Sequence, residues 1–328
     1  MKMKKFYYFE PEGFATALAL LAEHKGRAKI LAGGTELIPQ MKRGLTFPEV
    51  IINLSRVPGL REMKEGPEGL SMGALVTLGV LERSPLIASR YPGLHEAVGH
   101  LAVPAIRNAG TIGGNICLDT KCIYGDQMQT WERAFAPCFK RGGKKCYVVP
   151  GDKTCHASLA ADTIPILVAL EAKAKVVSLK GEKTIPVENL FTGNGIRPHS
   201  LSPVEILTEI ILPLQEKGMS SVYRRFSLRK AIDFPLASAA VCLKKKEGFC
   251  EEARVVLGAV ASRPLRLALV EGALKGEEIR EQILQECSRQ ASEEALRISK
   301  SGRIDSFSKT MITCLVYQTL KRAWLAEG

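Results

Sequence analysis

Two glycine-rich segments about eighty residues apart constrain this chain more than any other feature. The first reads LAGGTELIPQMK and includes Gly33 and Gly34, and the second reads RNAGTIGGNIC, with three glycines over 110–114. Glycine has no Cβ, so a backbone rich in it can approach another backbone or a ligand closely. The first segment is predicted to join a strand to a helix capped by Thr35. The bare N–H groups of two such turns would suit a diphosphate held from two sides. Neither segment has the G-x-G-x-x-G spacing of a Rossmann site.

The composition is that of a globular protein and excludes several classes. The chain has 328 residues, 46% hydrophobic and 24% charged, so it can bury two or three separate cores. Its net charge of +12 is spread along the whole chain, and no nucleic-acid-binding motif accompanies it. The apolar runs are shorter than the ~20 residues that span a bilayer, and the first residues lack a signal-peptide pattern. We therefore expect a cytoplasmic protein that binds neither nucleic acid nor membrane.

Hydrophobic periodicity predicts three units with boundaries near Arg56 and Lys217. The elements expected before the second glycine segment are a helix over 10–24, strands over 28–33, 49–54 and 69–74, a helix over 78–91 that Thr77 caps, and a helix over 95–103. A helix and strand pattern resumes at Ala160. Beyond Lys217, stretches typical of antiparallel strands lead into helices that continue to the end of the chain.

The segment over 116–158 follows neither the helical nor the strand period, and it is rich in cysteine. Loops of this length inside a domain are uncommon and usually functional. Five of the nine cysteines stand in it, and a reducing compartment disfavours disulfides. No C-x-x-C is present, so the spacing identifies neither a zinc ribbon nor a ferredoxin cluster, but it favours one shared metal centre. Residues 121–155 carry seven Lys or Arg and three Asp or Glu. These cations would offset the negative charge of an iron–sulfur cluster on four thiolates.

Five motifs resemble, in this order, those of the FAD-binding subunits of the xanthine dehydrogenase family of molybdenum hydroxylases: AGGTELIPQMK, GALVTLGVLE, RNAGTIGGNIC, ADTIPILVALEA and GAVASRPLR. The resemblance extends over nearly the whole chain. It implies an α+β protein with a vanillyl-alcohol-oxidase-type FAD-binding fold of two α/β subdomains, followed by a C-terminal domain of antiparallel sheet and helices. With the boundaries above, these are an N-terminal subdomain over 1–56, a middle subdomain over 57–216 and a C-terminal domain over 217–328.

The same resemblance implies that the two glycine segments grip the FAD diphosphate. The residues implied for FAD binding are Leu31, Ala32, Gly33, Gly34, Thr35, Glu36 and Leu37 in the first segment, and Thr111, Ile112, Gly113, Gly114 and Asn115 in the second. Asp162 matches an aspartate that contacts the flavin nucleotide, and Arg225 matches a flavin-contacting lysine. Arginine keeps the charge of that lysine but not its point-donor geometry. From the residues alone, Asp162 is equally well explained as the N-cap of the helix that follows it.

The cysteine-rich insertion resembles a loop in one branch of the family, the β subunits of 4-hydroxybenzoyl-CoA reductases, which holds an additional 4Fe–4S cluster. This resemblance implies four metal ligands: Cys122, Cys138, Cys146 and Cys155. Cys117, nearer the glycines, is then the spare thiol, although an exchange of Cys117 and Cys122 remains open. His156 would be a zinc ligand in a different scheme or else a surface histidine.

The resemblance thus implies the electron-transfer flavoprotein subunit of a molybdenum-dependent oxidoreductase, with FAD and a 4Fe–4S cluster as cofactors and no substrate-converting residue of its own. The implied partners are a molybdopterin-binding large subunit and a 2Fe–2S small subunit, as a dimer of heterotrimers, and a ferredoxin-like electron donor. The implied reaction is the reductive dehydroxylation of 4-hydroxybenzoyl-CoA or a related aromatic thioester. Two alternatives are a hydroxylase subunit that delivers electrons to NAD or a quinone, and a flavin-free, zinc-binding scaffold.

Overall fold

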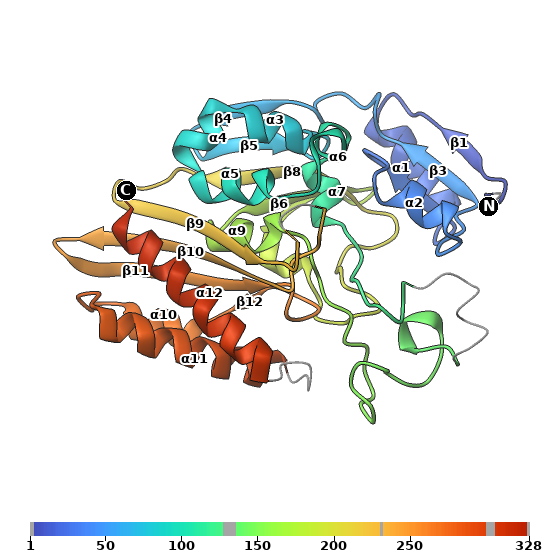
Figure 1. Ribbon diagram of the computed structural model, residues 1–328. Coiled ribbons are helices and arrows are strands. Elements are labelled where there is room, and N and C mark those ends of the chain that lie inside the picture. Colours follow the sequence, from blue (N-terminus) through green and yellow to red (C-terminus); the bar gives the residue numbers. More distant parts are fainter. Residues whose placement is uncertain (1–2, 127–135, 230–231, 300–305, 327–328) are drawn as a thin grey trace.

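The structure, a computed structural model, describes residues 3–126, 136–229, 232–299 and 306–326. Their strands form three β-sheets, and helices pack around these sheets (Figure 1). The N-terminus lies at the small first sheet, and the C-terminus lies at the opposite end of the molecule (Figure 1). The mixed architecture, with an antiparallel sheet and helices in its C-terminal part, confirms the predicted fold class.

The N-terminal sheet is small and parallel. Strand β3 (Val50–Asn53) lies between β1 (Tyr7–Phe9) and β2 (Ala28–Leu31). The first three residues of β3 are buried, as expected for a central strand that is covered on both faces. Helix α1 (Phe14–Glu23) buries one apolar face in the core, and α2 (Leu37–Lys42) follows β2 after the first glycine segment. The first glycine segment therefore joins a strand to a helix, as predicted.

The middle sheet has five strands in the order β4-β5-β8-β6-β7, and every neighbouring pair is antiparallel. Its strands are β4 (Met63–Gly66), β5 (Gly69–Gly73), β6 (Lys173–Ser178), β7 (Gly181–Pro186) and β8 (Ile206–Pro213). The helices that accompany it are α3 (Leu78–Arg83), α4 (Pro85–Arg90), α5 (Pro92–Gly99), α6 (Pro104–Ala109), α7 (Ile112–Ile116), α9 (Thr163–Ala169) and the 3-10 turn η2 (Val187–Leu190). This sheet and the N-terminal sheet share one hydrophobic core.

Two helix predictions in this part of the chain were wrong, in both cases because proline begins a new helix. The helix expected over 78–91 is divided at Ser84, whose side chain accepts from Ile87 N, and α4 begins with Pro85. The helix expected over 95–103 is displaced, since α5 begins at Pro92 and α6 at Pro104. The cap by Thr77 is confirmed, because its Oγ1 accepts a hydrogen bond from Val80 N at 3.3 Å.

The C-terminal sheet has its own core and is antiparallel, in the order β12-β11-β10-β9. Its elements are β9 (Met219–Phe226), β10 (Ala237–Lys246), β11 (Phe249–Gly258), β12 (Leu265–Arg266), α10 (Ala268–Leu274), α11 (Glu281–Ser299) and α12 (Ser306–Leu325). Helix α12 contacts β9 and β10, and α9 of the middle unit contacts β10 and β11. Because every residue of α9 is buried, this apolar helix joins the middle unit to the C-terminal sheet. Across the described ranges, no helix is both long and apolar enough to cross a membrane.

We expect Gly93→Ala to loosen the contact between α5 and β9. A Cβ at Gly93 would lie 2.7 Å from Ile166 Cδ1 and 3.1 Å from the backbone of Ser221 and Val222. Such overpacking costs about 1–3 kcal/mol of the free energy of unfolding, measurable by urea denaturation. Gly99→Ala is the control, because a Cβ there has open space around it. Equal stability of the two variants would contradict close packing between α5 and β9.

Candidate functional site

The two glycine segments meet in space, backbone against backbone. A Cβ on Gly33 would lie 1.9 Å from the carbonyl oxygen of Ala109, and one on Gly110 would lie 3.4 Å from Thr35 Oγ1. The first distance is impossible for any side chain, so only glycine permits this approach at position 33. The first loop runs from β2 to α2, and the second runs from α6 to α7. The structure therefore brings together the two predicted halves of the FAD site.

The first loop leaves all of its predicted FAD-binding residues accessible. Gly34 has a φ of +73°, the left-handed conformation that favours glycine. The seven residues predicted there are each half-buried: Leu31, Ala32, Gly33, Gly34, Thr35, Glu36 and Leu37. The predicted cap by Thr35 was wrong, because the N-cap residue of α2 is Glu36 and it makes no side-chain capping bond. The Glu36 carboxylate instead accepts from Gln40 Nε2 at 2.6 Å and from Lys121 Nζ.

The sequence predicted bare backbone N–H groups in the second loop, but three of them are hydrogen-bonded within the protein. Ile112 N donates to Val76 O and Gly113 N to Ala74 O, both at 2.9 Å. Gly114 N donates to Thr111 Oγ1 at 3.0 Å, so Thr111 caps α7. These bonds fix the loop against the segment that follows β5. The loop presents Gly114, which is half-buried, whereas the other predicted residues are buried: Thr111, Ile112, Gly113 and Asn115.

Asp162 and Arg225, the two further residues predicted to contact the flavin, form an ion pair. Their side chains are only 5% and 4% exposed, respectively. Arg225 Nη1 lies 3.2 Å from Asp162 Oδ1, and the Tyr223 hydroxyl donates to the same oxygen at 2.6 Å. Burial raises the pKa of Asp162, and the Arg225 charge opposes this shift. Asp162 is the N-cap residue of α9 but makes no capping bond, so its carboxylate serves this pair rather than the helix.

The residues present fit FAD in two respects. Arg225 Nη2 is buried and has no hydrogen-bond partner among the described residues, and a buried donor of this kind calls for an acceptor such as a ligand oxygen. Around Gly114, a Cβ would meet only Thr111 Oγ1 at 2.9 Å and Ala32 at 4.0 Å. The two loops thus leave open backbone beside Gly114 where a ligand can approach.

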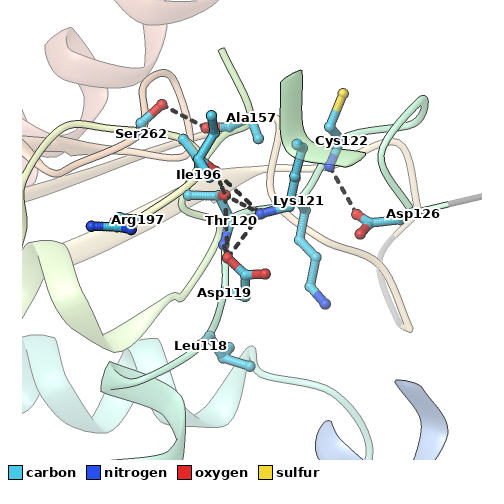
Figure 2. Close-up of polar contacts among 12 residues, drawn as sticks. Leu118, Asp119, Thr120, Lys121, Cys122, Asp126, Ala157, Ile196, Arg197 and Ser262 are labelled. Carbon is cyan, nitrogen blue, oxygen red and sulfur yellow. Dashed lines mark hydrogen bonds and ion pairs between the residues drawn. The ribbon is translucent and has the colours of Figure 1, made fainter. Parts of the chain in front are cut away.

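The cysteine loop begins directly after α7 and is closed at its base. Lys121 N donates to Ser158 O at 2.7 Å and Ser158 N donates back at 2.9 Å. Figure 1 shows the loop, in green, projecting from the rest of the molecule. At its two ends, Cys122 N donates to the Asp126 carboxylate and the Ser262 hydroxyl donates to Ala157 O (Figure 2). The predicted irregular structure is confirmed for the described residues of the loop, which hold only the short turn η1 (Phe139–Arg141).

Hydrogen bonds arrange the predicted metal ligands within this loop. Cys138 O accepts from Arg141 N and Gly143 N, and Phe139 N donates to Lys145 O, so a small closed turn joins Cys138 to Cys146. Both of these cysteines are buried. Gly195 packs against Cys155, because a Cβ there would lie 2.9 Å from Cys155 Sγ.

Cys155 lies in the electrostatic neighbourhood of two other predicted ligands. Burial raises the pKa of its thiol, Lys140 lowers it, and Cys122 and Cys138 raise it further. Among the described residues, however, no three His, Cys, Asp or Glu side chains are already arranged to hold a metal. Cys117 is exposed, and His156 lies 2.7 Å from Asp152 with its side chain 10% exposed, so it is not an exposed surface histidine. Two charged residues of the loop, Glu132 and Arg133, lie outside the described residues.

Three contacts join the cysteine loop to the first glycine loop and to residues just after α2. Lys121, beside Cys122, pairs with Glu36, and the Arg43 guanidinium donates to Asp126 O. Arg141 donates to Leu45 O at 3.2 Å. The sequence interpretation had counted Lys121 only as one charge of the loop. It also missed Tyr223, although residues 223 and 225 of one strand face the same side.

The family comparisons agree with this geometry. Residues 4–215 match the family described as "FAD binding domain in molybdopterin dehydrogenase", and residues 221–323 match "CO dehydrogenase flavoprotein C-terminal domain". The first match alone covers more than half of the chain.

Individual relatives cover most of the chain at modest identity. The carbon monoxide dehydrogenase medium chain of Hydrogenophaga pseudoflava is 28% identical over 98% of this chain and 97% of the relative. The nicotine 6-hydroxylase medium subunit of Paenarthrobacter nicotinovorans is 29% identical over 85% of this chain and 83% of the relative. Among solved structures, the carbon monoxide dehydrogenase of H. pseudoflava that lacks the Mo-pyranopterin moiety gives a TM-score of 0.79 at 27% identity, covering 99% of both chains. The chain therefore belongs to the family of FAD-binding subunits of molybdenum hydroxylases that includes the carbon monoxide dehydrogenase medium chains, and it is an oxidoreductase subunit.

Proposed function

We propose that this chain carries a 4Fe–4S cluster in addition to FAD and relays electrons between them. The observation that carries the proposal is the insertion itself. The second glycine loop leads, within eight residues of Gly114, to the first predicted ligand, Cys122. The insertion is closed at its base, buries Cys138 and Cys146, and docks on the first glycine loop through Lys121. This continuity would hold two redox centres on adjoining loops of one chain.

The proposed cluster ligands are Cys122, Cys138, Cys146 and Cys155, and the two glycine loops with Arg225 and Asp162 would hold FAD. When bound, FAD exchanges one or two electrons and a 4Fe–4S cluster exchanges one. The part of this chain is to bind both groups, to keep them on adjoining loops, and to compensate their charge. The chemical step on a substrate belongs to a partner subunit.

We propose that the partners are a molybdopterin-binding large subunit and a 2Fe–2S small subunit, in a cytoplasmic dimer of heterotrimers. The relatives are called medium subunits or medium chains, which supports a complex with a larger and a smaller subunit. The donor would be a ferredoxin-like protein, and the substrate 4-hydroxybenzoyl-CoA or a related aromatic thioester. Exposed cations of the cysteine loop, Lys144, Lys145 and Lys153, support an acidic donor.

A second candidate function reverses the electron flow. Relatives named nicotine 6-hydroxylase and nicotinate dehydrogenase favour an oxidised substrate whose electrons leave through FAD to NAD or a quinone. Such a chain has no need of a one-electron relay. A 4Fe–4S cluster in the insertion would therefore favour reduction by a one-electron donor, and its absence would favour the alternative.

We expect Gly114→Val to remove FAD while most of the fold remains. A β-branched side chain at this position would displace the Thr111 cap and enter the open space beside the loop. The purified complex should contain much less FAD than the wild type, because the side chain would fill the space through which a diphosphate approaches the backbone. The measurement is FAD released by acid, per chain, which also tests that binding is non-covalent.

The control for this experiment is Gly99→Val, since Gly99 is exposed and has open space around it. It should retain the full amount of FAD. Stoichiometric FAD in Gly114→Val would refute the assignment of the second loop, and flavin remaining with the acid precipitate would refute non-covalent binding.

We expect the full chain, produced without oxygen, to contain about four irons and four sulfides beyond those of any partner. Replacing Cys138, Cys146 or Cys155 by serine should lower both contents, because a hard oxygen ligand suits the cluster poorly. Iron and sulfide analysis, together with the broad charge-transfer absorption that zinc does not give, measures the result.

Cys117→Ser is the matched control and should keep the cluster. Zinc without iron in the unsubstituted chain would refute the relay and support the scaffold alternative. A cluster lost in Cys117→Ser but kept in Cys122→Ser would show that Cys117 is the first ligand.

A further inference from the structure

One buried cation lies inside the cysteine loop. Lys140, in η1 between Cys138 and Cys146, has a side chain only 9% exposed. Its Nζ donates to Thr120 Oγ1 at 2.7 Å, Asp119 Oδ1 at 2.8 Å and Gly195 O at 3.2 Å. An ammonium has three N–H donors, and all three are used here.

These acceptors come from two segments outside the turn that carries Lys140. Asp119 and Thr120 precede the base of the cysteine loop, and Thr120 also donates to Gly195 O at 2.7 Å. Gly195 belongs to the connection between η2 and β8, and it packs against Cys155 with no room for a Cβ. Lys140 therefore ties the segment before Cys122 and the backbone beside Cys155 to the turn between the other two predicted ligands.

Among the described residues, Asp119 is the one carboxylate that pairs with Lys140. Burying an ammonium is costly unless anions compensate it, and its carboxylate partner, Asp119, has a side chain that is 48% exposed. The other lysines of the loop, Lys144, Lys145 and Lys153, are exposed, where water and salt screen their charges. A centre carrying negative charge among the four cysteines would add to this compensation, and a buried cation acts on such a centre more strongly than a solvent-exposed one.

We propose that Lys140 is the positioning residue of the cluster and its charge-compensating cation: it holds the ligand-bearing segments together and makes the cluster easier to reduce. This inference rests on the proposed function. Reduction adds a negative charge to the cluster, so a fixed positive charge nearby stabilises the reduced form. Removal of that charge lowers the reduction potential, whereas removal of Asp119 raises it.

The test is a redox titration of the cluster in the whole complex, followed by electron paramagnetic resonance of the reduced form. In Lys140→Met, we expect the ratio of reduced to oxidised cluster at a fixed solution potential to fall at least tenfold, which is 59 mV for a one-electron couple. Lys140→Arg, which keeps the charge, should stay close to the wild type. Asp119→Asn should shift the ratio in the opposite direction. Lys144→Met, which removes an exposed lysine of the same loop, should leave it unchanged within about twofold.

A merely structural role for Lys140 would not shift the reduction potential of the cluster in opposite directions in Lys140→Met and Asp119→Asn. A full iron content with an unchanged potential in Lys140→Met would overturn the inference and leave the proposed function intact. If Lys140→Met loses its iron, the reduction potential of the cluster in Asp119→Asn becomes the test. An unchanged reduction potential in Asp119→Asn would then overturn the inference. Absence of iron from the unsubstituted complex would overturn the proposed function, and this inference with it.

Discussion

The backbone of Gly33 lies against that of Ala109 and Gly110, closer than any side chain permits. This contact joins the N-terminal sheet to the middle unit, because the first glycine loop follows β2 and amides of the second loop bond to the segment after β5. Gly114 and Ala32 lie beside this contact, where the proposed FAD site would be. This close contact at position 33 joins two units that also share one hydrophobic core, and it lies at the proposed FAD site.

The same contact sets the position of the cysteine loop. The second glycine loop continues through α7 into Cys122, and Lys121 reaches back to Glu36 of the first glycine loop. The two glycine loops and the start of the cysteine loop therefore form one connected assembly. An ion pair and close backbone contacts join its parts. In the proposed relay, this assembly would keep the separation of the two redox centres constant.

Features that depend on neighbouring residues in the sequence, such as a helix cap or a strand, could be predicted from the sequence. The Thr77 cap, the strand before Gly33 and the irregular loop over 116–158 were predicted correctly for the described residues. Two helix predictions were wrong because prolines, a local signal, begin new helices at Pro85, Pro92 and Pro104. Other features depend on tertiary contacts that the sequence does not indicate. Of the two interpretations of Asp162, capping of α9 was wrong, because its carboxylate pairs with Tyr223 and Arg225 from a strand more than fifty residues away. Flavin contact by Asp162 stays a prediction. Amides of the second loop bond to residues after β5. The acceptors of Lys140 lie in Asp119, Thr120 and Gly195, and no spacing in the sequence indicates that these segments meet.

Hydrogen–deuterium exchange of the full chain with and without FAD tests most directly whether the loops form one assembly. If they do, removing FAD should speed exchange of the amides over 34–43 and 120–126 together, because Glu36 and Lys121 link them. These two segments should change to a similar extent, while the C-terminal helices α11 and α12 stay protected. Faster exchange over 34–43 with no change over 120–126 would contradict the account, since the cysteine loop would then be independent of the flavin loops.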